Sequence, residues 1–151
     1  MTEEVNLRTI SKPKSSLLDV VFVHGLTGDA TKTWTSKSGF WPEWLAEGNQ
    51  MVGVYTLGFP ASKFKKSVNR ELDIYELAKP STELLCGNGI GQRPVMFVTH
   101  NFGGILTKLI LQHCNGSLDN AHACPVSPIR IHKLAHTLFS LFSACPLQKL
   151  V

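Results

Sequence analysis

Three apolar runs divide the chain, and each is stopped by a turn that contains glycine or proline. The runs cover residues 17–23, 52–59 and 94–98. They are short, rich in β-branched residues and nearly free of polar positions, which is typical of strands buried on both faces of a parallel sheet. The pattern therefore predicts three strands of one mostly parallel sheet.

Helical patterns follow the first two runs. The Pro42–Glu43 pair is suited to the first turn of a short helix, where proline is tolerated and an acid favours the helix dipole. Ser67 is a candidate cap for a helix over residues 68–78. We expect Pro80 to interrupt that helix, because proline removes a backbone donor, and the pattern restarts at 82–85.

A stronger helical pattern covers residues 105–113, directly after the third apolar run. The Asn115–Gly116 pair is a good C-terminal stop for this helix. Strands that alternate with helices in this way predict the α/β class, with a mostly parallel sheet and flanking helices.

The length and the pattern together suggest one domain with three parts. Residues 1–16 form an N-terminal segment, 17–116 form the core, and 117–151 form a divergent C-terminal segment. The last segment contains apolar residues at helical spacing: Leu134, Leu138, Leu141 and Phe142. This stripe predicts an amphipathic helix that packs on the sheet in preference to binding lipid.

Composition narrows the class of protein. Hydrophobic residues make up 43% of the chain and charged residues 17%, which excludes a disordered protein. The net charge of +4 comes largely from a basic run at 63–66, which we read as a solvated loop. No motif supports binding to nucleic acid. The acidic, polar N-terminus lacks the features of a secretory signal, so we expect an intracellular, cytoplasmic protein.

Cysteine and histidine patterns do not indicate a metal or cofactor. The four cysteines show no C-x-x-C pair and no zinc spacing, which favours reduced thiols. His132 and His136 have the histidine spacing of a metalloprotease helix, but Lys133 stands where that helix needs glutamate. We therefore expect no metal site and no cofactor.

The third predicted strand leads into the most informative motif, residues 99–104, which we call the elbow. The sequence Thr-His-Asn-Phe-Gly-Gly lies between a strand and a helix, as in the nucleophile elbow G-x-S-x-G. Asn101 occupies the position of the serine. An amide has no ionisable proton and is a very poor nucleophile, so the atom for acyl chemistry is missing.

The elbow and the segment at 21–29, Val-Phe-Val-His-Gly-Leu-Thr-Gly-Asp, together resemble a known group. The chain is similar to the α/β-hydrolase domain of the serine active site-containing protein family. More distantly, that domain is similar to lipases and to inositol deacylases of lipid anchors. The resemblance covers about residues 17–116, and three further segments fit it: 32–34, 40–42 and 55–59.

The resemblance implies roles for several residues around the elbow. An acyl hydrolase needs backbone N–H groups aimed at the developing oxyanion. In this architecture the donors are the N–H of Phe102, after the nucleophile position, and the N–H of Leu26, in the loop after the first strand. The residues expected to shape that loop and the elbow are His24, Gly25, His100, Gly103 and Gly104. We expect His24 to support the loop and not to act as the general base.

The same resemblance places a catalytic acid and histidine after later strands. Asp119 follows the elbow helix too soon, and His122, His132 and His136 fall in sequence unlike the family. We therefore expect a truncated α/β-hydrolase relative without catalytic activity. The first alternative is a regulatory module that binds an acyl or lipid ligand, or a protein. Self-association through the exposed edge of the strand at 94–98 also fits that alternative. The second is an active ester hydrolase that uses another residue or a partner chain. By the resemblance, association with an organelle or a membrane surface stays open.

Overall fold

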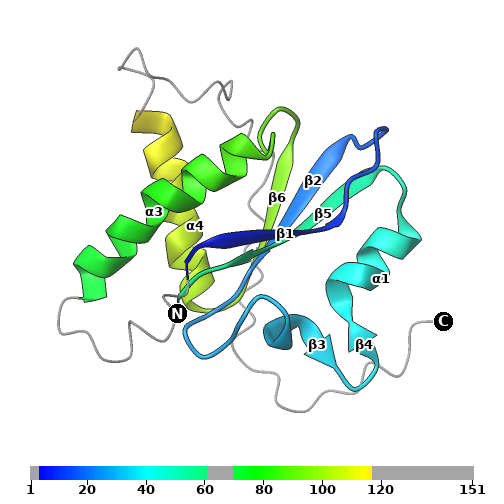
Figure 1. The fold of residues 1–151 in the computed structure, drawn as a ribbon, viewed down its shortest axis with the longest axis horizontal. Helices are drawn as coiled ribbons and strands as arrows, with labels where there is room; N and C mark the ends of the chain where they lie inside the picture. The colour runs from blue at the N-terminus through cyan, green and yellow to red at the C-terminus, as the bar shows by residue number, and fades with distance from the viewer. Residues whose placement is uncertain (1–3, 61–69, 117–151) are drawn as a thin grey trace.

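The computed structural model describes residues 4–60 and 70–116, and it shows a mixed four-stranded sheet flanked by three helices (Figure 1). The elements in chain order are β1 (Asn6–Ser11), β2 (Leu18–Val23), the short 3-10 helix η1 (Lys32–Trp34), β3 (Thr35–Ser36), β4 (Gly39–Phe40), α1 (Trp41–Gly48), β5 (Val52–Gly58), α3 (Arg70–Gly87), β6 (Val95–Thr99) and α4 (Phe102–Gly116). The predicted α/β class is confirmed.

The sheet has the strand order β1-β5-β2-β6. The three predicted strands are parallel neighbours, and in their register Val21 lies opposite both Tyr55 and Phe97. β2 and β5 are buried along almost their whole length, as predicted. β6 lies at an edge of the sheet and only Val95 is buried, so the prediction of burial on both faces is wrong for this strand. The prediction of a mostly parallel sheet is confirmed.

The sequence analysis did not predict β1, which pairs antiparallel with β5 and forms the other edge of the sheet. Its residues are mostly exposed or half-buried, so the apolar signal is weak. A register shift between Thr9 and Ser11 also breaks the alternation that marks a half-buried strand. The small hairpin of β3 and β4 was missed for a simpler reason, since each strand has only two residues.

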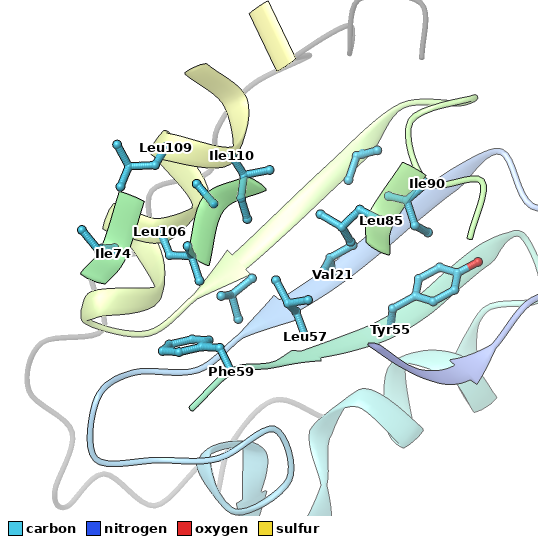
Figure 2. Packing of buried hydrophobic residues seen from close by; sticks show 13 residues of the cluster. Val21, Tyr55, Leu57, Phe59, Ile74, Leu85, Ile90, Leu106, Leu109 and Ile110 are labelled. Carbon is cyan, nitrogen blue, oxygen red and sulfur yellow. The ribbon is translucent and has the colours of Figure 1, made fainter. Parts of the chain in front are cut away.

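Helices cover the two faces of the sheet unequally. On one face α3 and α4 lie side by side and enclose the larger core, where Leu106 and Ile110 pack over Val21 and Leu57 (Figure 2). On the other face α1 and the loop before it cover a second cluster around Phe22. Burial of these side chains supplies most of the stabilisation, at about 25 cal/mol per Å² of apolar surface.

Helix α3 continues through Pro80, so the predicted interruption is wrong. Proline inside a helix costs about 3 kcal/mol because one hydrogen bond is lost. Here Pro80 is exposed, while Ala78 and Leu85 bury one face of the helix in the larger core. That packing keeps both halves in one helix. The proposed cap at Ser67 lies outside the described residues, as does the predicted C-terminal helix with its apolar stripe.

Helix α4 begins at Phe102 and ends at Gly116, so it is longer than the predicted 105–113 but stops where expected. None of the described helices is long and apolar enough to cross a membrane.

Two of the four cysteines lie in the described part of the chain. Cys114 carries a free thiol, and burial raises its pKa, although a hydrogen bond with Thr82 acts in the other direction. Cys86 is disulfide-bonded, contrary to the prediction of reduced thiols. Spacing along the chain does not reveal which thiols a fold brings together.

Candidate functional site

The elbow joins β6 to α4 with only two residues between them. Asn101 has a φ of 51°, and it is the one non-glycine residue of the described chain with positive φ. Left-handed backbone is unfavourable for most side chains, and asparagine is among the few that tolerate it. The strand, the sharp turn and the helix therefore follow one another as in a nucleophile elbow, with an amide at its apex.

The side chain of Asn101 is exposed, but its oxygen is engaged. Oδ1 accepts a hydrogen bond from the backbone N–H of Phe102, with 2.6 Å between oxygen and nitrogen. The next two amides of α4 are also bonded within the turn. The N–H of Gly103 donates to the carbonyl of His100, and the N–H of Gly104 donates to the carbonyl of Asn101, both at 3.0 Å.

The loop after β2, residues 24–28, lies directly against the elbow. A Cβ atom at Gly25 would be 2.9 Å from Nδ1 of His100 and 3.1 Å from Cβ of Asn101. A Cβ atom at Gly103 would overlap the carbonyl oxygens of Val23 and His24. Each segment thus contributes one glycine whose missing side chain permits the close contact.

His24 is buried and holds this loop to the end of β5. Its ring stacks on the ring of Phe59, with centroids 4.1 Å apart and planes inclined by 6°. The N–H of Phe59 donates to Nε2 at 3.2 Å, and Nδ1 lies 2.8 Å from the carbonyl oxygen of Gly25. These bonds assign the proton to Nδ1. Both ring nitrogens therefore face backbone groups.

The two backbone N–H donors implied by the resemblance, those of Phe102 and Leu26, differ in their hydrogen bonding. The N–H of Phe102 donates to Asn101. The N–H of Leu26 donates to no backbone carbonyl among the described residues. Both side chains are half-buried and pack against the larger core, and the ring of Phe102 lies 6.3 Å from the ring of Phe59. At this end of the sheet, apolar side chains therefore surround the backbone N–H groups of Leu26 and Phe102.

An acidic cap and an aromatic cluster hold the rest of the loop that leads to α1. Oδ1 of Asp29 accepts hydrogen bonds from the N–H groups of Thr31 and Lys32, at 2.8 and 2.7 Å. Partial burial acts to raise the pKa of Asp29, but these bonds and the charge of Lys32 outweigh it and lower the pKa. Behind this turn, Trp34 packs edge-on against Phe22.

A buried polar group, which the sequence analysis missed, lies at the opposite end of β2. The carboxylate of Asp19 is fully buried, and Arg93 donates to it through Nε at 2.9 Å and to the carbonyl of Ser16 through Nη1 at 2.9 Å. Burial, and next the negative charge of Asp19, raise the pKa of Tyr55. A side chain at Gly53 would overlap Asp19. An aspartate inside an apolar run was the signal that could have revealed this group.

No set of three or more histidine, cysteine, aspartate or glutamate side chains converges in the described ranges 4–60 and 70–116, so they show no candidate metal site.

Comparison with known proteins gives a partial match. No protein-family model matches the chain. Its homologues include Protein SERAC1 of Homo sapiens, 29% identical over 114 residues, and of Danio rerio, 33% identical over 116 residues. Each match covers 62% of this chain but only 17% of the human and 18% of the zebrafish protein. The chain therefore spans less than a fifth of the length of these relatives.

Proposed function

We propose that the chain is an α/β-hydrolase-like module that does not turn over esters, and that its elbow serves a binding or regulatory role. The main support is Asn101 at the apex of the elbow, where its φ is 51° and its side chain accepts a hydrogen bond from the first amide of α4. The homology to SERAC1 and the sheet order support the hydrolase-like architecture.

Acyl transfer by such a site needs a nucleophile, an oriented base and oxyanion donors. An asparagine side chain is not a nucleophile at neutral pH. Three histidines lie in the described residues, and we expect none of them to act as a base for residue 101. The nitrogens of His24 face backbone groups, and Nδ1 of His100 is buried under Gly25 without a hydrogen bond. His113 is eleven residues beyond the start of α4, roughly 16 Å along the helix axis.

The binding role has two candidate partners, each suggested by a different surface. Leu26, Phe59 and Phe102 form apolar surroundings at the elbow that suit the hydrocarbon part of an acyl or lipid ligand. The outer edge of β6 has no neighbouring strand in the described sheet, and Met96 on that strand is 36% exposed. An apolar strand edge of this kind suits a protein partner or a second copy of the chain.

Ester hydrolysis by the full chain tests the proposal. We expect hydrolysis of p-nitrophenyl butyrate at the background rate, and no labelling by a fluorophosphonate probe. The Asn101→Ser variant should remain inactive, because a serine attacks efficiently only when a base takes its proton. Turnover by the native chain that disappears in Asn101→Ala would overturn the proposal.

A further inference from the structure

The hydrogen bond between Asn101 and Phe102 engages the first backbone amide of α4. The first amides of a helix have no partner within the helix, and they are the groups that an elbow presents to a substrate oxygen. A capping side chain usually bonds the second or third helical amide. In this elbow those two amides already donate to the carbonyls of His100 and Asn101.

The Asn101 side chain instead bonds the amide of the first helical residue. Its oxygen lies 2.6 Å from the nitrogen of Phe102, within the range of a good hydrogen bond. Every one of the first three amides of α4 therefore has an acceptor supplied by residues 100–101. The donor that would receive an acyl oxygen is engaged by the protein itself.

We propose that Oδ1 of Asn101 permanently occupies the backbone N–H of Phe102 as its hydrogen-bond acceptor. This N–H is then not available to the carbonyl or carboxylate oxygens of acyl groups. This inference rests on the proposed function, because it assumes that the elbow is the ancestral acyl site. It explains the choice of side chain at this position. The hydroxyl oxygen of a serine is one bond closer to the backbone than the amide oxygen of asparagine. We therefore expect that a serine at position 101 would not reach the N–H of Phe102 in the same way.

Asparagine also suits the backbone here. The positive φ at position 101 is unfavourable for most residues that have a β-carbon, and asparagine tolerates it better than alanine or serine. Glycine adopts the same φ without strain and has no side-chain acceptor. Asn101→Gly therefore removes the occupant while it keeps the turn, and Asn101→Asp is the matched control, since it keeps an oxygen at the same position along the side chain.

The test is backbone amide NMR on the full ¹⁵N-labelled chain. We expect the Phe102 amide to exchange slowly in the native and Asn101→Asp proteins and about tenfold faster in Asn101→Gly, because the hydrogen bond is gone. Asn101→Ser provides a second removal if the glycine variant folds poorly. Excess butyrate should shift the Phe102 amide signal in Asn101→Gly and leave that of the native chain unchanged.

Equal exchange of the Phe102 amide in the native chain and in both removal variants would overturn the inference. A butyrate shift in the native chain as large as in the variant would also overturn it, and so would no shift in either protein. These outcomes are distinct from a failure of the proposed function, which would appear as ester turnover that depends on Asn101.

Discussion

The backbone N–H of Phe59 donates a hydrogen bond to Nε2 of His24, and the two rings stack with centroids 4.1 Å apart. This pair joins the end of β5 to the loop after β2. We expect His24→Phe to keep the stacking but to leave a buried donor unpaired, which costs about 1–3 kcal/mol of unfolding free energy. Urea denaturation measures the loss. The exposed control Gln112→Ala should change stability by less than about 0.5 kcal/mol, and an equal effect of both would contradict the role of His24.

Gly103 and Gly104 are neighbours in the sequence but differ in the space around them. A methyl group at Gly103 meets two backbone carbonyl oxygens, which cannot move aside without moving the end of β2. A methyl group at Gly104 meets only the Thr99 hydroxyl, at 3.3 Å. We expect Gly103→Ala to destabilise the protein by about 1–3 kcal/mol, as overpacking does, and Gly104→Ala by clearly less. Thermal melts of the two variants check this order, and equal melting temperatures would show that the close contact does not matter.

The buried pair of Asp19 and Arg93 ties β2 to the residues that precede β6. We expect Arg93→Ala to cost about 3–5 kcal/mol, because the carboxylate stays buried without its partner. Arg93→Ala combined with Asp19→Ala should be less destabilising than the sum of the single variants. The exposed pair of Lys79 and Glu83 is the control, and Lys79→Ala should change stability by less than about 0.5 kcal/mol. Additive effects at Asp19 and Arg93 would exclude a coupled pair.

Asp29 predicts a small acid-dependent contribution to stability. Its pKa is lowered in the folded state, so the ionised carboxylate stabilises the loop above the unfolded pKa. That contribution is lost as the pH falls below about 4 and through the folded pKa. The substitution Asp29→Asn keeps an oxygen acceptor without a charge, so we expect the stability difference between the native chain and this variant to shrink below that pH. Urea melts at pH 7 and pH 3 measure it. A difference that is constant over this range would refute the assignment.

The edge of β6 predicts self-association that a charge can suppress. Lysine on an edge strand discourages pairing with another strand. We expect Met96→Lys to lower the association of the full chain in sedimentation experiments. Met51→Lys is the control, because Met51 is 49% exposed but lies in the turn before β5, away from that edge. A purely monomeric native chain, or equal effects of both substitutions, would remove the edge of β6 as an interaction surface.

The elements that sequence alone identified are those whose signal is local. The three parallel strands are continuous apolar runs, α1 has a proline in its first turn, and the elbow is a contiguous motif, so neighbouring residues carry enough information. The sequence alone likewise shows that position 101 of the elbow holds asparagine and not serine.

Other features depended on contacts between distant parts of the chain. β1 has a weak pattern and exists because β5 offers it an edge. Helix α3 passes through Pro80 because its buried face packs on α4 and the sheet. Arg93 meets Asp19 across 74 positions of sequence. Even the bond from Phe102 to Asn101, between adjacent residues, lies in a turn where Asn101 has positive φ and Gly25 of the distant loop is packed closely against it. Tertiary packing decided these features because its free energy exceeds the local preferences that sequence patterns report.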